Sequence, residues 1–322
     1  MDVSQTSDAC ASVLDAVSGA VIVDDEVLRT ILSGLLGRGH VLLEDVPGTG
    51  KTLTARSFAS ALGLSFSRIQ FTPDLLPADV TGTDIYNERT GEFEFKPGPL
   101  FANVVLADEI NRASPKTQAA LLEAMEERQV TVTGETHQLS SPFFVIATQN
   151  PVERGEGTFP LPEAQKDRFL VKTSLGYPSA PEELELLERR DTRDARTPKV
   201  ERALATADVR AIQASTERIR VHRDVKRYIV DVVRETRADR RVRVGVSPRG
   251  SQRLFEVARA RAVLAGRTFV TPDDVKDAAV PTLAHRVVLT SDARVAHVSK
   301  ADVVADVLEE VPVPTIAREA RS

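Results

Sequence analysis

The sequence predicts an α/β protein: a parallel sheet covered by helices on both faces, followed by an all-helical lid domain. Short apolar runs that read as buried strands lie at 40–45, 103–109 and 143–150. Helical stretches separate them, and this alternation indicates a parallel sheet. A glycine-containing loop at 46–50 joins the first strand to a helix. After residue 178 helical periodicity dominates, so we expect two domains, 1–178 and 179–322.

Composition restricts the class of protein. The chain has 322 residues, of which 42% are hydrophobic and 28% charged, as in ordinary globular proteins. Its one cysteine, Cys10, excludes an internal disulfide framework and suits a reducing compartment. We expect Cys10 to be an inert residue on an N-terminal helix. The sequence has neither an apolar run of membrane-spanning length nor the basic, apolar start of a signal peptide, which indicates a cytoplasmic protein.

The first half of the core is predicted element by element. Residues 8–37 look helical, with a break near 18–24. HVLLED (40–45) is a short apolar run between Gly39 and Pro47, typical of a buried strand. The helical spacing of KTLTARSFASALG (51–63) ends at Gly63, a common C-terminal stop. The segment FSRIQF (66–71) reads as the next strand.

Two hairpins interrupt the second half of the core. The first covers 82–100, where Phe93 and Phe95 alternate with charged residues and NERTG supplies the turn. The second covers 129–140, with Gly134-Glu135 as its two-residue turn. Between them we expect a strand at 103–109 and a helix that begins with Ser114 and Pro115 and runs to about Glu127.

The lid is predicted from helical stripes and caps. One stripe of apolar residues comprises Val225, Tyr228, Ile229, Val232 and Val233. Ser247-Pro248 and Thr271-Pro272 each look like the start of a helix. The final helix, VSKADVVADVLEEV, is amphipathic and is expected to pack on the lid.

The stretch EDVPGTGKT (44–52) has the character of a phosphate-binding loop. Gly50, Lys51 and Thr52 fit the usual pattern G-x-x-x-x-G-K-[ST], although Asp45 stands where the first glycine is usual. Backbone N–H groups at a helix N-terminus bind phosphates, the Lys51 charge would meet the β- and γ-phosphate oxygens, and the Thr52 hydroxyl can ligate Mg²⁺. The Asp45 side chain can point away. The alternative is a glycine-rich connection without a ligand. The predicted ATP-binding residues are Pro47, Gly48, Thr49, Gly50, Lys51, Thr52 and Leu53.

Acidic and polar side chains follow the other two buried strands. Asp108 and Glu109 end the run VVLADE, and we expect Asp108 to hold Mg²⁺ and Glu109 to activate the attacking water. Asn150 ends FFVIATQN, on a strand expected between the other two, where its amide can hold that water. The alternatives are solvated acids at a strand end and a turn-forming Asn before Pro151. Ligands of open α/β sheets bind at this edge, which favours the functional interpretation.

Two arginines could reach phosphate from farther along the chain. Arg168 lies in EAQKDRF, after a helix-like stretch, and Arg249 lies in the first turn of the helix that begins in GVSPRGS. Each could equally be an ordinary surface arginine.

Together these segments resemble the MoxR-type AAA+ ATPases over nearly the whole chain. The stretches that match are GHVLLEDVPGTGKT (39–52), GPLFANVVLADEINRASPKTQAALLEAMEERQVTV (98–132), VIATQNPVERGEGTFPLPEAQKDRF (145–169) and GVSPRG (245–250). The run GTFPLPEAQKDRF is especially specific. The hairpin at 82–100 resembles the helix-2 insert of this clade, and the hairpin at 129–140 resembles its pre-sensor-1 hairpin.

The resemblance implies roles and partners. Asn150 would be sensor 1, Arg168 the arginine finger given in trans to a neighbouring subunit, and Arg249 sensor 2. A ring, expected to be a homo-hexamer with ATP at its interfaces, follows from that. Family members usually carry Gly-Gln before the first core helix, near the adenine, whereas this chain has Val23 and Asp24. That departure concerns recognition of the base rather than of the phosphates.

Several purposes for hydrolysis stay open. MoxR proteins are similar to chaperones that activate partners, such as proteins with a von Willebrand A domain or metalloenzymes. Residues 218–267 hold 15 Lys/Arg and 5 Asp/Glu, so nucleic-acid remodelling is an alternative, although Tyr228 and Phe255 are the segment's only aromatics. Solvated helix faces or a contact with an acidic neighbouring subunit rank above it. A magnesium chelatase-like motor and a nucleotide-gated scaffold without turnover are further alternatives.

Overall fold

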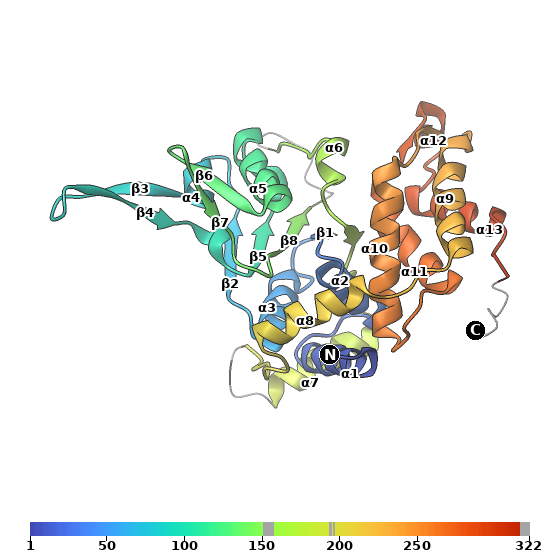
Figure 1. Ribbon diagram of the computed structural model, residues 1–322, viewed down its shortest axis with the longest axis horizontal. Helices are drawn as coiled ribbons and strands as arrows, with labels where there is room; N and C mark the ends of the chain where they lie inside the picture. The colour runs from blue at the N-terminus through green and yellow to red at the C-terminus, as the bar shows by residue number, and fades with distance from the viewer. Residues whose placement is uncertain (151–157, 193–194, 196, 316–322) are drawn as a thin grey trace.

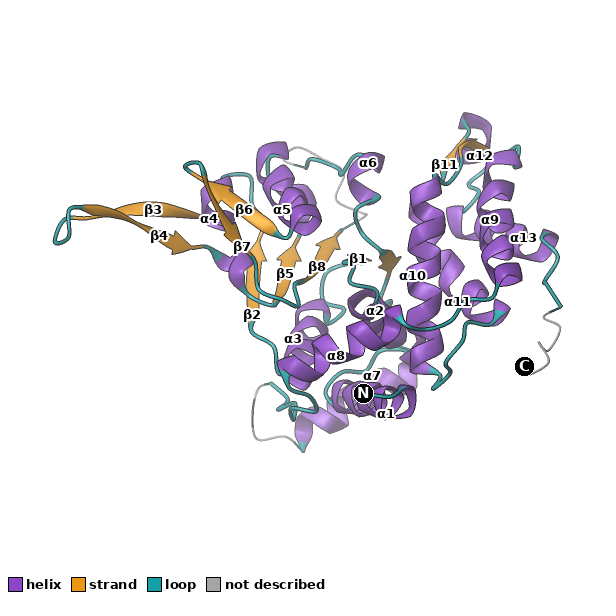
Figure 2. Ribbon diagram, in the orientation of Figure 1, coloured by secondary structure: helices purple, strands orange, loops and turns teal. Residues whose placement is uncertain are grey.

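The computed structural model describes residues 1–150, 158–192, 195 and 197–315. Its centre is a parallel sheet with the strand order β2-β5-β8-β1-β9 (Figures 1 and 2). The strands are β1 (Val41–Glu44), β2 (Phe66–Gln70), β5 (Val104–Asp108), β8 (Phe144–Gln149) and β9 (Val171–Thr173). The predicted α/β fold is confirmed.

The sheet is buried on both faces, which explains the continuous apolar runs in its strands. Successive strand residues alternate between two apolar clusters: Leu43 and Leu106 pack into one, whereas Leu42 and Val105 pack into the other. Helices α1 (Val3–Ser18), α2 (Asp25–Leu36) and α3 (Lys51–Ala61) cover the first face. Helices α4 (Pro77–Thr81), α5 (Pro115–Glu127) and α6 (Glu163–Lys166) lie on the side of the second. The short 3₁₀ turns η1 (Pro99–Phe101) and η2 (Ile110–Arg112) flank β5.

The N-terminal predictions hold in detail. The expected break near 18–24 separates α1 from α2, and the Asp24 side chain caps α2 by accepting from the backbone of Glu26 at 2.7 Å. Cys10 is buried in α1, and burial raises the pKa of its thiol to about 12. A thiol that stays protonated is unreactive, as expected for Cys10.

Both predicted hairpins are present, as β3 (Gly82–Asn87) with β4 (Glu92–Pro97) and β6 (Gln129–Val132) with β7 (Glu135–Gln138). The turn of the second hairpin differs from the prediction of Gly134-Glu135. Val132 pairs with Glu135, so the two turn residues are Thr133 and Gly134, both with positive φ. A two-residue turn with positive φ at both positions matches the twist of the strands, which moves the turn back by one residue.

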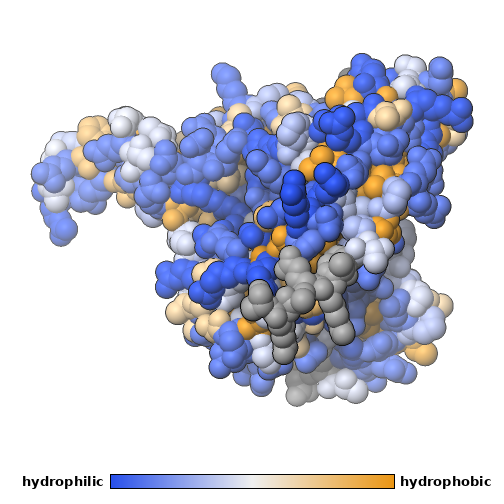
Figure 3. Space-filling model, turned by 45° about the vertical axis from the view of Figure 1, so that its right-hand side comes forward, coloured by the Kyte–Doolittle hydropathy of each residue, from blue (hydrophilic) through white to orange (hydrophobic). Residues whose placement is uncertain are grey.

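The first hairpin forms a long ribbon that extends from the body of the molecule (Figure 1). Its base rests on the second hairpin: the rings of Phe95 and His137 stack with centroids 3.8 Å apart, and the Thr133 hydroxyl donates to Asp84. Farther out, Tyr86 and Phe93 are 53% and 72% exposed. In Figure 3 this ribbon shows hydrophobic side chains among hydrophilic ones.

The C-terminal region is helical, as predicted. Its elements are α7 (Ala180–Asp191), α8 (Thr206–Glu217), α9 (Arg223–Ala238), β10 (Val242–Val244), α10 (Pro248–Leu264), α11 (Pro272–Leu283), η3 (Ala284–Arg286), β11 (Val288–Leu289), α12 (Ser291–Val295) and α13 (Lys300–Glu310). The predicted stripe is the buried face of α9, and the two predicted helix starts are those of α10 and α11. The lid also contains a short antiparallel pair, β10 with β11. Helix α13 packs on the lid.

Helices α7 and α8 follow residue 178 in the chain but lie against the core (Figure 1). Gln213 of α8 donates to the Leu35 carbonyl at 2.8 Å, and Arg189 of α7 donates to the Ser18 carbonyl at 3.0 Å. The domain boundary near 178–181 stays a prediction. No helix within the described ranges is both long and apolar enough to cross a bilayer.

Candidate functional site

The predicted loop lies at the carboxyl edge of the sheet, between the end of β1 at Glu44 and the start of α3 at Lys51. Gly48 and Gly50 have φ of 88° and 89°, a conformation that residues with a side chain rarely adopt. A Cβ atom built on either glycine would meet nothing within 4 Å. The backbone conformation, and not a lack of space, is therefore what requires glycine at these two positions.

A pocket of about 410 Å³ joins this loop to the residues predicted from the other strands. Its lining residues are Pro47, Gly48, Gly50, Lys51, Thr52, Leu53, Arg68, Asp108, Glu109, Thr148 and Asn150. The structure thus brings together every predicted site residue except Thr49, Arg168 and Arg249. Thr49 belongs to the same loop, and its hydroxyl donates to the Val46 carbonyl at 3.3 Å.

Lys51 is held by the loop itself. Its Nζ donates to the carbonyl oxygens of Val46 at 2.6 Å and Asp45 at 3.2 Å. The Asp45 carboxylate points away, as expected, and accepts from the backbone N–H groups of Leu175 and Gly176 after β9. Lys51 is thus held by neutral backbone carbonyl groups, and the Asp45 carboxylate does not pair with it. Its full positive charge is available for a phosphate.

Asp108 ends β5 and is 7% exposed. Its Oδ1 accepts from the Thr148 hydroxyl at 2.6 Å, and its Oδ2 accepts from Nε and Nη2 of Arg68 at 3.2 and 2.7 Å. Thr148 lies on β8 and Arg68 on β2, the two strands beside β5. Both neighbouring strands therefore orient this carboxylate.

Glu109 follows with a φ of 57°, which is rare for a residue other than glycine. Its backbone N–H donates to Thr148 Oγ1 at 2.8 Å, so one hydroxyl contacts both acidic residues. Its Oε2 accepts from Gln70 Nε2 at 2.8 Å and from Arg112 Nη1 at 3.3 Å. Strained backbone that its surroundings hold in place is common at functional sites.

Asn150 follows β8, which lies between β5 and β1 as predicted. It is 7% exposed and lines the pocket between the loop and the acidic pair. Parallel strands end at one edge, and for this reason the three predicted segments meet there.

Sequence reasoning missed Arg68, Gln70 and Thr148. A signal was present for the first two, because Arg68 and Gln70 alternate along the strand FSRIQF and so share one face. Arg68 Nη2 also donates to Gln70 Oε1 at 2.8 Å, and the pair thereby links both acidic residues. Only the register of β2 against β5, which pairs Gln70 with Asp108, brings them to the site.

Arg168 and Arg249 lie at the other edge of the sheet. Arg168 precedes Leu170, whose N–H donates to the His40 carbonyl at the start of β1. Both arginines bind Glu126 near the end of α5: Arg168 Nε at 2.9 Å and Arg249 Nη2 at 3.0 Å. Neither lines the phosphate pocket within the described chain. The structure brings the two predicted arginines together, but not to the phosphate loop of their own chain.

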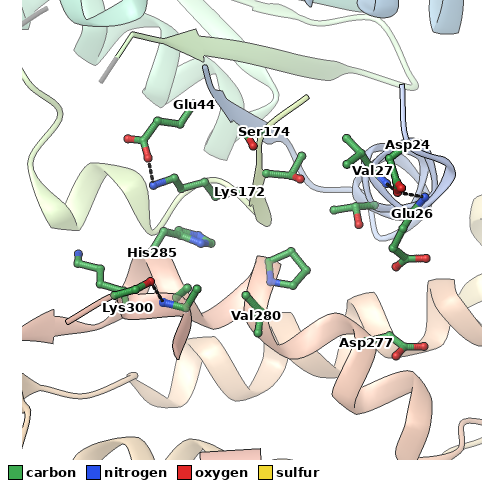
Figure 4. Close-up of a pocket in the computed structure, with 16 residues that line it drawn as sticks. Asp24, Glu26, Val27, Glu44, Lys172, Ser174, Asp277, Val280, His285 and Lys300 are labelled. Carbon is green, nitrogen blue, oxygen red and sulfur yellow. Dashed lines mark hydrogen bonds and ion pairs between the residues drawn. The ribbon is translucent and has the colours of Figure 1, made fainter. Parts of the chain in front are cut away.

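A second cavity of about 680 Å³ lies between α2, the ends of β1 and β9, and the lid (Figure 4). Asp24 lines it, and so do the ion pair of Glu44 with Lys172 and the buried His285 of the lid. Burial lowers the pKa of His285 well below its ordinary value, so the ring is neutral. No residue of 45–52 lines this cavity, which makes it distinct from the phosphate pocket.

Several basic residues of the segment 218–267 form ion pairs with acids of the same chain. Arg241 pairs with Asp239 and Asp306, Arg267 pairs with Asp274, and Arg261 pairs with Glu26. These contacts fix helices of the lid to one another and to α2. They give these three arginines a structural role.

Comparison with known proteins identifies the family. Residues 40–171 match the model described as "ATPase family associated with various cellular activities (AAA)", and residues 234–307 match an AAA lid domain. The chain is 44% identical to "Chaperone MoxR1" of Mycobacterium tuberculosis, over 93% of this chain and 81% of that protein. It is 52% identical to YeaC of Bacillus subtilis, over 88% of each.

Two further comparisons agree. The chain is 35% identical to "Protein MoxR" of Paracoccus denitrificans, over 85% of this chain and 87% of that protein. A solved structure from Cytophaga hutchinsonii superposes with a TM-score of 0.89 at 38% identity, covering 97% of this chain and 96% of the other. With the phosphate loop and acidic pair in one pocket, these matches assign the chain to the MoxR family of AAA ATPases, enzymes that hydrolyse ATP.

Proposed function

We propose that this chain is a Mg²⁺-dependent ATPase that works in the cytoplasm as a ring, expected to be a hexamer, and remodels partner proteins. The observation that carries the proposal is the separation of the site into two halves. The phosphate loop, Asp108 and Glu109 meet at the carboxyl edge of the sheet, whereas Arg168 and Arg249 meet at the amino edge. A second copy that presents its arginines to the pocket would complete the site.

The residues of the pocket have distinct roles in this proposal. The loop N–H groups and Lys51 bind the phosphates and offset the charge that develops on the γ-phosphoryl group. Glu109 accepts a proton from the attacking water, and the Asn150 amide orients that water. Arg168 and Arg249 of the neighbouring copy stabilise the leaving charge, a role worth about 10³–10⁵ in rate for an arginine finger.

The donor set in the pocket fits Mg²⁺. Thr52 supplies a hydroxyl and Asp108 a carboxylate, and both are hard oxygen ligands on the lining of one pocket. No cluster of three or more His, Cys, Asp or Glu that could hold a metal occurs among the described residues. That suits an ion bound largely through phosphates and water, as Mg²⁺ usually is. When bound, Mg²⁺ held by Thr52 and Asp108 would draw negative charge from the phosphates.

The remodelling role is supported by the similarity to a chaperone and by the shape of the molecule. The ribbon of β3 and β4 carries Tyr86 and Phe93 exposed beyond the body, and its base stacks on the second hairpin. Exposed apolar side chains on a protrusion suit contact with a client. We expect the client to be a von Willebrand A domain protein or a metalloenzyme.

The test is a substrate trap. The variant Glu109→Gln keeps the phosphate loop but loses the base, so it should bind ATP, assemble and retain its client, while phosphate release falls about 10²–10⁴-fold. The trap is incubated with native lysate, ATP and Mg²⁺, and the retained proteins are identified by mass spectrometry. Lys51→Ala, which should not bind ATP, is the control.

The outcomes separate the hypotheses. A von Willebrand A protein or a metalloenzyme subunit retained only by the trap supports the chaperone function. DNA or replication proteins retained instead, with binding that weakens as salt rises, would replace it with the nucleic-acid alternative. Turnover by Glu109→Gln at the parent rate would show that Glu109 is not the base.

A further inference from the structure

The carboxylate of Glu126 is shared by two arginines from different parts of the chain. Its Oε2 accepts from Arg168 Nε at 2.9 Å, and its Oε1 accepts from Arg249 Nη2 at 3.0 Å. Arg168 lies 42 residues away in sequence and Arg249 lies 123 residues away, at the start of lid helix α10. Glu126 itself is on α5 of the core. One acidic residue therefore links the finger, the lid arginine and the core.

The particular nitrogens that bind Glu126 leave the arginines able to act. Arg168 uses its inner Nε, so both terminal amino groups of the guanidinium stay free of Glu126. Arg249 uses Nη2, and its Nε lies 3.7 Å from Asp167 Oδ2, which leaves Nη1. Terminal amino groups form the fork that binds phosphate oxygens. The contact therefore orients both guanidinium groups, and Glu126 leaves unused both terminal amino groups of Arg168 and one, Nη1, of Arg249.

The negative charge of Glu126 stabilises the close approach of the two arginines. Two guanidinium groups held close together repel each other, and a shared anion between them offsets that repulsion. The hydrogen bond from Arg168 lowers the pKa of Glu126, so the residue is ionised. The neighbouring Asp167 is anchored in turn by the buried Arg286, whose Nε donates to Asp167 Oδ1 at 2.7 Å. The buried Arg286 of the lid therefore fixes the position of Asp167 beside Arg249.

We propose that Glu126 is a positioning residue, which holds Arg168 and Arg249 together so that both enter the phosphate pocket of a neighbouring copy. This inference rests on the proposed function, because it requires the two arginines to act in trans. Glu126 itself is not expected to touch the nucleotide. Its loss should lower kcat by about ten- to a hundredfold through misplacement of the arginines, with KM changed less than about twofold.

The test mixes two inactive variants. Lys51→Ala has arginines but no functional pocket, whereas Arg168→Ala has a pocket but no finger. Mixed in equal amounts, they should restore activity at the interfaces where an intact pocket meets an intact finger, roughly a quarter of the interfaces in a random ring. The Glu126→Gln change is then added to one partner or to the other.

Glu126→Gln should matter only on the subunit that supplies the finger. With Lys51→Ala/Glu126→Gln as that subunit, the restored ATPase rate should fall about ten- to a hundredfold. With Arg168→Ala/Glu126→Gln as the pocket subunit, the rate should stay as in the parent mixture, which also shows that a Glu126→Gln subunit folds and assembles. The matched control is Lys51→Ala/Glu127→Gln. Glu127 is the next residue of α5 and is exposed, and its side chain forms no hydrogen bond or ion pair with the described part of the chain.

Two failures are distinguishable. If Lys51→Ala and Arg168→Ala do not restore activity in any mixture that forms rings by sedimentation, the proposed action in trans is wrong. If they do restore activity, and the Glu126→Gln finger subunit works as well as or better than its parent, the positioning role is wrong. A rate increase would mean that Glu126 withholds the arginines rather than presenting them.

Discussion

The phosphate pocket and the arginine cluster are built in different ways. In the pocket, Asp108 and Asn150 are each 7% exposed, and neighbouring strands of one sheet hold the side chains. In the cluster, the side chains of Arg168 and Arg249 are 32% and 38% exposed, and they meet only because the lid docks against the core. The residues that line the pocket all come from one chain, whereas the arginine cluster is partly exposed to solvent. Under the proposed function, this difference makes ATP binding a property of the subunit and rapid hydrolysis a property of the assembly.

The largest expected effect separates the two regions directly. Lys51→Ala should abolish measurable ATP binding, because the loop loses the charge that meets the phosphates. Arg168→Ala should leave ATP affinity within about threefold but lower kcat about 10³-fold or more, as expected for a finger that acts on the transition state. Equilibrium binding of a fluorescent ATP analogue and steady-state phosphate release measure the two quantities. Equal loss of binding in both variants would contradict the division into halves.

A smaller effect is expected from Gly50→Ala. The φ of Gly50 is 89°, and an added methyl group would meet open space, so the cost lies in the backbone conformation and not in a clash. Holding a residue with a side chain in that conformation costs about 1–3 kcal/mol. The variant loop is therefore either strained by this amount or shifted to another conformation. We expect ATP affinity to fall about tenfold or more, while the arginine cluster still supports complementation of an Arg168→Ala partner. Affinity measured by calorimetry at the parent value would contradict this.

Arg68 sharpens the comparison within the pocket. Its guanidinium lies 2.7 Å from Asp108 Oδ2, where a divalent cation would also be attracted. Removing the arginine charge in Arg68→Gln should therefore strengthen the apparent Mg²⁺ affinity of the ATP complex about three- to tenfold, since the competing cation is gone. Titration of Mg²⁺ against bound fluorescent ATP tests this, with Arg56→Gln on α3 as a control of equal charge change. An unchanged or weaker Mg²⁺ dependence would mean that Arg68 does not compete with the ion.

The smallest effect concerns the amino edge and pH. His40 is buried there: its Nε2 lies 3.1 Å from the Met125 carbonyl beside Glu126, and its Nδ1 accepts from the Val145 N–H at 3.0 Å. Burial lowers the pKa of His40 well below its ordinary value. Below pH 6.5, His40 therefore binds a proton in the unfolded chain more readily than in the folded chain. The neutral, buried His40 therefore contributes its full stability above pH 6.5, near the pKa of histidine in the unfolded chain. This contribution is lost as the pH falls below that value.

Below pH 6.5, protonation linked to His40 should lower the free energy of unfolding by up to about 1.4 kcal/mol for each unit of pH. The buried His285 should lower it by a similar amount. Urea unfolding at pH 7.5 and 5.5 measures it. His40→Gln should reduce the slope, whereas His297→Gln, at an exposed position, should not. A pH-independent parent protein would contradict the assignment of both rings as neutral.

The sequence by itself determined the parts of the site whose geometry is local. Gly48 and Gly50 set the loop conformation, the apolar run 40–45 placed a strand before it, and helical spacing placed a helix after it. The acidic residues at the end of VVLADE and the amide at the end of FFVIATQN could be placed for the same reason, since parallel strands end at one edge. The turn of the second hairpin, shifted by one residue, shows where local pattern is weakest.

Only the tertiary structure decided which distant residues meet. Arg68 reaches Asp108 across 40 residues through the register of β2 against β5, and Arg249 reaches Glu126 across 123 residues through the docking of the lid. Arg68 and Glu126 gave no sign of their partners in the sequence, and Arg249 was predicted to reach phosphate but not to meet Glu126, because the pattern of charges along a chain does not identify the partner of each charge. The physical reason is that strand registers and domain contacts are set by many apolar side chains acting together. The partners of each charge follow from that packing.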